Sequence, residues 1–412
     1  MRNRWSHLLL VLFAGATILA LLGRLKNVGE RSLDQWYAAR SYEILHKFDN
    51  VRRYDQLFRP PKMSTNSYVD LLEFRPLVAD GPRENATLLM LCRNWELPGV
   101  LSSMRSLEDR FNSRFHYDWV FLNDVPFDVD FVEATSAMAS GRTFYGLVPD
   151  EDWNTPRWID PLRYEECLQD MLAKDVPYGG SRSYRNMCRF NSGFFFRQEL
   201  LDNYDYYFRV EPNVEYFCDF PYDPFRVMRE HHKKYGFVIT LTEYEQTVPT
   251  LWQAVRAFAA EHPELVDLAT NLHEFVTSGP AAPSALADLE YNLCHFWSNF
   301  EIGDLNFFRS PAYLTFFEHL DRAGGFYYER WGDAPVHSLA AALLLRADEV
   351  HHFEEIGYFH VPYGTCPSAH VARLAQRCVC NFGREAVDIE HTSHSCLDHW
   401  WRRGGGKFFL SM

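Results

Sequence analysis

The chain has 412 residues and a formal net charge of −14, and 47% of its residues are apolar and 16% aromatic. The apolar content excludes wholesale disorder, because it is enough to build a core. The acidic balance argues against a nucleic-acid partner, since proteins that bind nucleic acids usually present a dominant basic face.

The charge is unevenly distributed along the chain. Residues 1–66 contain 11 Lys and Arg against 5 Asp and Glu, which is a net charge of +6. The remaining residues contain 30 against 50, a net charge of −20. This asymmetry predicts a short basic N-terminal piece joined to a strongly acidic body.

An uncharged, almost wholly apolar run from Leu8 to Leu22 reads LLLVLFAGATILALL. With its neutral neighbours the run reaches 19 residues, close to the roughly 20 that span a bilayer. Arg2 and Arg4 precede it, which favours a cytosolic N-terminus even though Arg24 and Lys26 follow. We therefore predict a cytosolic tail over 1–7, a transmembrane signal-anchor over 8–23, a stem over 24–66 and a luminal domain over 67–412.

A cleaved signal peptide is the competing interpretation of the apolar run. Ala14-Gly15-Ala16 has the small residues of a cleavage site. Only Leu8–Phe13 would then form the apolar region ahead of the site, which is short for a signal peptide. Both interpretations place the body in the secretory lumen.

Two further features of the sequence bear on a luminal body. Asn85-Ala86-Thr87 is an N-glycosylation sequon next to a predicted strand. There are nine cysteines, and an odd number leaves at least one thiol without a partner in the chain. A cluster of cysteines and histidines near the C-terminus suggests either a zinc site or disulfides that hold this segment, and an oxidising lumen favours disulfides; the cluster consists of Cys378, Cys380, Cys396, His391 and His394.

The body opens with a predicted β-α-β unit. Thr87–Cys92 and Tyr117–Leu122 are short apolar runs suited to buried strands, and apolar residues at helical spacing lie between them from Val100 to Phe111. In open α/β sheets, ligands bind beyond the carboxyl ends of the strands. Polar residues occupy both ends here: Arg93, Asn94, Asn123 and Asp124. The chain has no G-x-G-x-x-G motif and no P-loop, so a nucleotide would have to be held in another way.

Strands continue to alternate with helices further along the chain. Strands are predicted over Thr143–Val148, Asn191–Phe196, Tyr206–Val210 and Phe237–Leu241. An amphipathic helix is predicted over Leu251–Ala259. The alternation predicts an α/β fold with a mixed, mainly parallel central sheet.

Two segments contain carboxylates in positions suited to metal binding or catalysis. Pro212 ends the strand that begins at Tyr206 and leaves Glu211 at its mouth, where a carboxylate can bind a divalent cation. A solvated glutamate at a strand end is the alternative. Within Tyr291–Asp304, Glu301 lies among aromatic residues, which suits a nucleophile or base. The alternative there is an amphipathic helix whose acidic residues face water.

Two later segments contain further candidate groups. Asp333 and His337 lie near a turn marked by Gly and Pro, and the alternative is a solvated surface turn. His360 belongs to a small histidine cluster with His351 and His352, and such a cluster favours a ligand site only modestly over ordinary core or surface histidines.

Five segments, together with the β-α-β opening, resemble the fungal Golgi α-1,2-mannosyltransferases of glycosyltransferase family fifteen. The resemblance extends from about residue 67 to about residue 400, with the motifs in family order. The segments are SYRNMCRFNSGFF (Ser183–Phe195), RVEPNVEYFCD (Arg209–Asp219), YNLCHFWSNFEIGD (Tyr291–Asp304), ERWGDAPVHS (Glu329–Ser338) and IGYFHVPYGTCP (Ile356–Pro367).

The resemblance implies a type II Golgi membrane enzyme whose luminal part is a single large GT-A-like domain. It implies transfer of mannose from GDP-mannose to a mannose hydroxyl of O-linked or N-linked mannoprotein glycans, with retention of the α configuration and with Mn²⁺. The implied partners are GDP-mannose, a mannose-terminated glycan or glycoprotein acceptor, and the membrane through one N-terminal span.

The resemblance also implies roles for particular residues. Glu211 and His360 match the metal ligands, and Glu301 matches the proposed nucleophile. Tyr184 matches an active-site tyrosine, and Asp333 matches a carboxylate near the acceptor. We add the strand-end residues as candidates for binding the nucleotide, namely Arg93, Asn123 and Asp124.

One position departs from the family pattern. The family's E-P-D motif stands here as Glu211-Pro212-Asn213. This departure is the one motif feature that favours the alternative function, a non-catalytic mannan-binding or scaffolding paralogue on the same fold. A related enzyme with a different acceptor is a third hypothesis.

Overall fold

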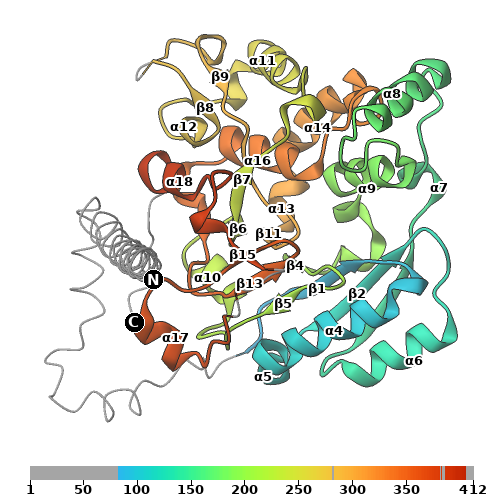
Figure 1. Ribbon diagram of the computed structural model, residues 1–412, viewed down its shortest axis with the longest axis vertical. Helices are drawn as coiled ribbons and strands as arrows, with labels where there is room; N and C mark the ends of the chain where they lie inside the picture. The colour runs from blue at the N-terminus through green and yellow to red at the C-terminus, as the bar shows by residue number, and fades with distance from the viewer. Residues whose placement is uncertain (1–81, 281–282, 381, 383–385, 405–412) are drawn as a thin grey trace, which may run out of the picture. The chain divides into compact units, whose positions relative to one another are not determined.

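The computed structural model describes residues 82–280, 283–380, 382 and 386–404 (Figure 1). The predicted tail, signal-anchor and stem, and the domain boundary at residue 67, lie outside this range. None of the helices within the described ranges is long and apolar enough to cross a membrane.

A seven-stranded sheet forms the centre of the described structure. Its spatial order is β12-β6-β11-β4-β1-β2-β3. Strand β11 runs antiparallel to both of its neighbours, and the other four pairings are parallel. The predicted α/β fold with a mixed, mainly parallel sheet is therefore confirmed. The strands are β1 (Ala86–Leu91), β2 (Asp118–Asn123), β3 (Thr143–Leu147), β4 (Tyr206–Arg209), β6 (Tyr235–Phe237), β11 (Glu301–Asp304) and β12 (Val350–His352).

Helices cover the sheet in two groups, which Figure 1 shows at opposite ends of the view. Helices α4 (Leu97–Leu107) and α6 (Val129–Met138) pack together near β1, β2 and β3. Helices α9 (Arg182–Gly193), α14 (Pro311–Ala323) and α16 (Asp333–Leu344) pack against one another in the second group. Almost every residue of α16 is buried, so this helix has no polar face and lies inside the core.

Smaller elements complete the fold. A four-stranded sheet has the order β15-β14-β13-β5, and two strand pairs are β10-β7 and β8-β9. These strands are β5 (Glu215–Tyr216), β7 (Thr240–Thr242), β8 (Thr277–Ser278), β9 (Glu290–Tyr291), β10 (Cys294–Phe296), β13 (Tyr358–His360), β14 (Tyr363–Thr365) and β15 (Val387–Asp388). The other helices are α5 (Ser113–Phe115), α7 (Asp150–Trp153), α8 (Pro161–Ala173), α10 (Pro224–Glu230), α11 (Leu251–Glu261), α12 (His273–Val276), α13 (Leu305–Phe308), α15 (Gly325–Tyr328), α17 (His370–Ala375) and α18 (Leu397–Arg403).

The structure corrects three of the predicted elements. The strand predicted over Asn191–Phe196 is wrong, because this segment ends α9 and continues into a 3₁₀ turn. It is buried against α14 and α16, and a short apolar run does not distinguish a buried helix end from a strand. The strand predicted over Phe237–Leu241 is divided between β6 and β7. The helix considered for Tyr291–Asp304 is also wrong, since this segment forms β9, β10 and β11 and buries Glu301.

Six of the nine cysteines form disulfides. The pairs are Cys218–Cys378, Cys294–Cys396 and Cys366–Cys380, and Cys92, Cys167 and Cys188 remain as thiols. The disulfide interpretation of the C-terminal cysteines is confirmed. The zinc interpretation is wrong, because all three of these cysteines are oxidised to disulfides.

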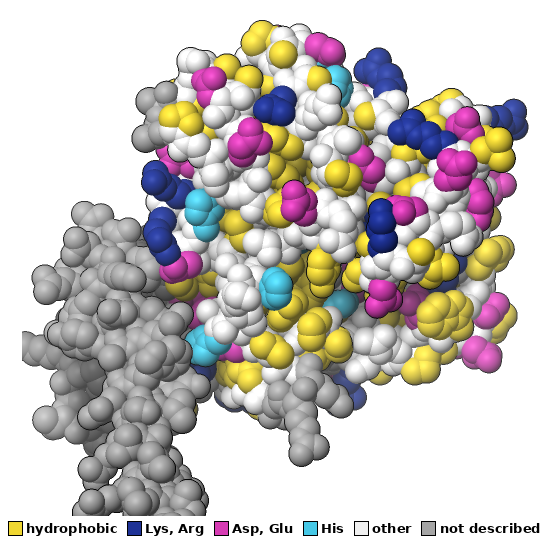
Figure 2. Space-filling model, turned by 45° about the horizontal axis from the view of Figure 1, so that its top comes forward, with side chains coloured by type: hydrophobic (Ala, Val, Ile, Leu, Met, Phe, Trp, Pro, Cys, Tyr) yellow, Lys and Arg dark blue, Asp and Glu magenta, His cyan; other side chains and the backbone are white. Residues whose placement is uncertain are grey.

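Figure 2 shows one face of the molecule. On this face the basic, acidic and apolar side chains are interspersed, and the Lys and Arg side chains do not gather in one patch.

Candidate active site

A cavity of about 350 Å³ lies at the carboxyl ends of β1, β2 and β4. This is the edge where an open α/β sheet binds ligands. Six of the eight predicted site residues line the cavity, and they come from distant parts of the sequence: Arg93, Asn123, Asp124, Tyr184, Glu211 and Glu301. The other two lie one contact away, because Asp333 binds Arg209 and His360 approaches Glu211.

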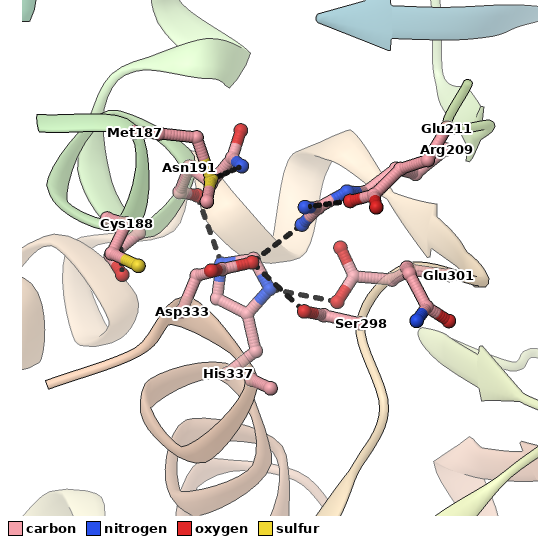
Figure 3. A network of polar contacts seen from close by, with 12 residues as sticks. Met187, Cys188, Asn191, Arg209, Glu211, Ser298, Glu301, Asp333 and His337 are labelled. Atoms are coloured by element: carbon pink, nitrogen blue, oxygen red, sulfur yellow. Dashed lines mark hydrogen bonds and ion pairs between the residues drawn. The ribbon is translucent and has the colours of Figure 1, made fainter. Parts of the chain in front are cut away.

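Arg209, the last residue of β4, organises the charges beside the cavity (Figure 3). One guanidinium nitrogen lies 2.5 Å from Glu211 Oε1 and another lies 2.5 Å from Asp333 Oδ2. Ser298 also donates its hydroxyl to Asp333 Oδ2, at 2.8 Å. Arg209 therefore holds two of the predicted acidic residues in fixed positions.

Arg209 also explains the ionisation of these acids. Burial raises the pKa of Glu211, but the charge of Arg209 and the contact with His360 outweigh burial and lower it to about 2. Burial likewise raises the pKa of Asp333, and the charges of Arg209 and His337 more than offset it, so this pKa is lowered. Both carboxylates are therefore ionised at neutral pH.

Glu211 and His360 form a two-ligand arrangement that suits a divalent cation. Glu211 Oε2 lies 3.6 Å from His360 Nε2. The other ring nitrogen, Nδ1, donates to the Val361 carbonyl oxygen at 2.9 Å, which leaves the Nε2 lone pair of the neutral ring directed at Glu211. Two ligand atoms, each about 2.1 Å from one cation, would be roughly 3.0–3.6 Å apart, so the pair fits a shared ion.

Asn213 has a structural role in the turn after β4. Its backbone has a φ of 62°, in the left-handed region that Asn adopts more readily than most residues. Its N–H donates to the Gly99 carbonyl oxygen at 3.1 Å, and a Cβ on Gly99 would lie 2.6 Å from the Asn213 side chain. Asn213 is not among the residues that line the cavity. The departure from the E-P-D pattern therefore falls on a residue that shapes the turn against α4.

Glu301 lies fully buried on β11, directly beside Arg209 on β4. Its Oε1 accepts a hydrogen bond from the Tyr207 hydroxyl. Its Oε2 accepts from the Tyr235 hydroxyl at 2.6 Å and contacts His337 Nδ1 at 2.7 Å. The alternative in which this glutamate faces water is therefore wrong.

Tyr184, on α9, has an aromatic and a cationic neighbour at its ring. The Tyr178 ring stacks on it at 4.4 Å with an interplanar angle of 2°, and the Arg330 guanidinium lies 5.2 Å from the ring centre. Burial raises the pKa of Tyr184 well above its usual value, so its hydroxyl remains protonated. Tyr184 therefore contributes a neutral hydroxyl, not a phenolate, to the lining of the cavity.

The three strand-end residues meet at one side of the cavity. Arg93 forms an ion pair with Asp124 at 3.1 Å and donates to the Ser183 hydroxyl at 2.8 Å. Asn123 accepts from the Asp124 N–H through Oδ1, and its buried Nδ2 has no hydrogen-bond partner within the described part of the chain. A buried donor without a partner is costly, which points to a ligand acceptor here.

Sequence reasoning missed four residues of this site: Arg209, Tyr207, Tyr235 and Ser298. The sequence does contain a signal for Arg209, because a charged residue is unusual in an otherwise apolar strand and this one lies two residues before Glu211. The sequence predicts no role for His337 beyond its position near the Gly-Pro turn. The solvated-turn alternative is wrong for this segment, because Gly332 caps the start of α16 and both Asp333 and His337 are buried.

Comparisons with known proteins identify the family of this chain. A family model described as glycolipid 2-alpha-mannosyltransferase matches residues 47–404. The chain is 58% identical to the probable mannosyltransferase KTR2 of Saccharomyces cerevisiae, over 92% of this chain and 90% of that protein. It is 51% identical to the alpha-1,2 mannosyltransferase KTR1 of the same yeast, over 78% and 79%.

Two solved structures are similar in fold and sequence. Core-mannan synthase A (CmsA/Ktr4) from Aspergillus fumigatus, in an Mn/GDP form, has a TM-score of 0.72 at 41% identity, covering 80% of this chain and 88% of that chain. The mannosyltransferase Ktr4p from S. cerevisiae, in complex with GDP, has a TM-score of 0.72 at 34% identity, covering 84% and 94%.

Proposed function

The chain belongs to the glycolipid 2-alpha-mannosyltransferase family, and from this premise we propose that it transfers mannose from GDP-mannose to a mannose hydroxyl in α-1,2 linkage. The chain is a glycosyltransferase of the mannosyltransferase type. Retention of the α configuration, a GT-A-like fold and the use of Mn²⁺ belong to the same proposal. The relative solved in an Mn/GDP form supports the choice of metal and nucleotide.

The observation that carries the proposal is the pair of Glu211 Oε2 and His360 Nε2, 3.6 Å apart beside the cavity. These two residues would hold Mn²⁺ and leave most of its coordination sphere for diphosphate oxygens and water. When bound, the metal supplies positive charge that neutralises the GDP leaving group. Because residues 67–412 carry a net charge of −20, a diphosphate needs such compensation here.

The proposal assigns the remaining residues either to the donor substrate or to the acceptor. The unpartnered Asn123 Nδ2 and the guanidinium of Arg93 offer donors to the nucleotide. Glu301 presents its carboxylate to the donor sugar. In the same proposal Asp333, which Arg209 and Ser298 hold one contact away from the cavity, belongs to the acceptor side. Catalysis requires these groups to hold donor and acceptor in the right relative orientation, because orientation supplies a large part of the rate enhancement of an enzyme.

The test measures GDP release from GDP-mannose with Mn²⁺ and an α-mannoside acceptor. We expect wild-type activity and its loss in Glu211→Ala and in His360→Ala, because each variant removes one protein ligand of the metal. Glu215→Gln is the matched control, since Glu215 is an exposed glutamate on the neighbouring strand β5. Unchanged activity in both site variants would overturn the metal assignment.

The linkage and its configuration need a separate measurement on the product. We expect an α-anomeric proton in its NMR spectrum, and digestion by an α-1,2-specific mannosidase. A panel of O-linked, N-linked and lipid-linked mannosides would identify the acceptor. A β-linked product would contradict retention.

We also propose that the protein is a type II Golgi membrane protein with a luminal catalytic domain. The basic residues before the apolar run support this orientation, and three disulfides suit an oxidising compartment. In sealed Golgi vesicles we expect a C-terminal epitope to be protected from added protease until detergent is present. Digestion of that epitope without detergent would refute the orientation.

A further inference from the structure

Glu301 is held by three hydrogen-bonding groups, and together they decide which of its lone pairs remains open. A carboxylate offers about four lone-pair positions, two on each oxygen. Tyr207 occupies one position on Oε1, and Tyr235 and His337 occupy both positions on Oε2. The second position on Oε1 is the one that these contacts leave open. In Figure 3 this oxygen points away from His337.

The contacts of His337 determine its protonation. Its Nε2 lies 3.0 Å from the Asn191 carbonyl oxygen, and a carbonyl oxygen only accepts, so Nε2 carries a proton. Its Nδ1 faces Glu301 Oε2 at 2.7 Å. When Glu301 is ionised, Nδ1 must also carry a proton. The ring is then an imidazolium that forms an ion pair with the carboxylate.

The surroundings of His337 favour this charged form. Burial lowers the pKa of His337, but the charge of Glu301 and the hydrogen bond to it outweigh burial, so the pKa is raised. Asp333, one turn earlier on α16, also raises it, and Arg209 opposes it from β4. The aromatic rings of Phe195, Phe308 and Tyr313 lie around the His337 ring and are uncharged. The two tyrosines that share Glu301 with it, Tyr207 and Tyr235, are also neutral.

We propose that His337 is a positioning residue which, as an imidazolium, pairs with the Glu301 carboxylate and holds its open Oε1 lone pair toward the cavity. This inference rests on the proposed function, because Glu301 faces the donor sugar only if the chain is the proposed transferase. His337 also lines the cavity, but both of its ring nitrogens bond to oxygens of the protein, so neither is offered to the substrate. Its effect on catalysis passes through the orientation and charge of Glu301.

The first test compares the pH dependence of kcat in wild type and His337→Asn. Asparagine keeps an N–H donor near the Nδ1 position but removes the positive charge. Measurements at saturating Mn²⁺ and GDP-mannose suppress proton competition at the metal ligands. We expect kcat to fall by about 10–100-fold and KM for GDP-mannose to change by less than about 3-fold. We also expect the profile to lose the alkaline limb set by deprotonation of the His337 imidazolium, because asparagine does not titrate.

The control variant is His352→Asn. His352 is a buried histidine on β12, two strands from β11, and its Nε2 also contacts a backbone carbonyl oxygen, that of Val238 at 3.1 Å. We expect its profile to match that of wild type. An unchanged profile in His337→Asn, or a uniform loss of kcat that leaves the alkaline limb in place, would overturn the proposal, since both results indicate a merely structural residue.

The second test needs no turnover. Nitrogen-15 NMR of histidine-labelled protein at neutral pH should show one ring with both nitrogens protonated that is absent from His337→Asn. Detection of a neutral His337 ring would overturn the proposal even in an active enzyme. A wild-type chain that transfers no mannose but shows this imidazolium would refute the proposed function while leaving the ion pair intact. The two failures are therefore distinguishable.

Discussion

At the scale of single residues, one arginine, Arg209, provides the positive charge for several carboxylates of the site. Glu211, Asp333 and Glu301 lie around Arg209, which bonds directly to the first two. Arg209 is largely buried, with 12% of its side chain exposed. Its planar guanidinium reaches two carboxylates at once, which the single ammonium of lysine cannot do. Arg209 therefore connects Glu211, the proposed metal ligand, to Asp333, the proposed acceptor-side carboxylate.

Two substitutions of Arg209 test its geometry and its charge separately. Lysine keeps the positive charge but not the planar guanidinium, and alanine removes both. We expect Arg209→Lys to lower kcat/KM by about 100-fold, because one carboxylate loses its partner and shifts. Arg209→Ala should also lower the free energy of unfolding by about 3–5 kcal/mol, since it leaves buried carboxylates without a counter-charge. Steady-state kinetics and denaturant titration measure the two effects. Arg229→Lys, at a side chain that is 51% exposed, is the control. Wild-type kcat/KM in Arg209→Lys would refute the bridging role.

At the scale of elements, strand ends and helix starts place the functional groups. Pro212 follows β4 and the left-handed Asn213 turns the chain against α4, so Glu211 is left at the cavity. Gly332 caps α16 and places Asp333 in its first turn, with His337 one turn further along the same helix. Helix α10 is capped by Asp223, whose Oδ1 accepts from the Phe225 N–H at 3.0 Å and whose Oδ2 accepts from the Tyr117 hydroxyl at 2.5 Å.

Asp223 makes stability depend on pH. Burial raises its pKa to about 6, although the bonds from Tyr117 and Phe225 oppose the rise. Between about pH 4 and pH 6 the folded state therefore keeps a proton that the unfolded state has released. The free energy of unfolding should fall as pH rises through this window, and the contribution of Asp223 is about 2–3 kcal/mol.

Asp223→Asn isolates this contribution, because asparagine still caps the helix through Oδ1 and its Nδ2 can donate to the Tyr117 hydroxyl in place of the bond that Asp223 Oδ2 accepts. Denaturant unfolding at several pH values should show the variant gaining stability relative to wild type as pH rises from 4 to 7. A constant difference between the two proteins across this range would refute the assignment.

At the scale of the whole molecule, disulfides join segments that are far apart in sequence. Cys294–Cys396 ties β10 to the residue that precedes α18, across 102 residues of chain. Trp400 of α18 is buried against Phe237, Phe275 and Phe296, so the C-terminal helix belongs to the core. Cys218–Cys378 spans 160 residues and holds the segment after α17 beside β5.

Removing the Cys294–Cys396 bond should destabilise the protein. We expect Cys294→Ser/Cys396→Ser to lower the free energy of unfolding by about 3–5 kcal/mol, because a loop of this length gains much entropy when it opens. Guanidinium titration of the oxidised proteins measures this difference. Cys167→Ser changes a half-buried thiol that forms no disulfide and should alter stability by less than about 1 kcal/mol. Equal stability of wild type and double variant would show that this bond is not structural.

Much of the architecture can be predicted from the sequence, because local patterns of apolar residues indicate where strands and helices begin and end. Strands β1, β2, β3 and β4 and helix α11 lie within a few residues of their predicted bounds. The polar residues after β1 and β2 meet at the predicted edge, since parallel strands end together. The apolar run Asn191–Phe196 failed as a strand because periodicity does not separate a buried helix end from a buried strand.

The sequence by itself determined the family, the α/β pattern and the eight candidate residues, because motifs and apolar periodicity are local properties of the chain. Only the tertiary structure decided what those residues touch. Arg209 joins Glu211 to Asp333, and His337 reaches Glu301 from a helix 36 residues away. The tertiary structure also showed that Asn213 shapes the turn after β4. Such contacts depend on β11 lying antiparallel between β4 and β6, and no local pattern encodes that long-range pairing.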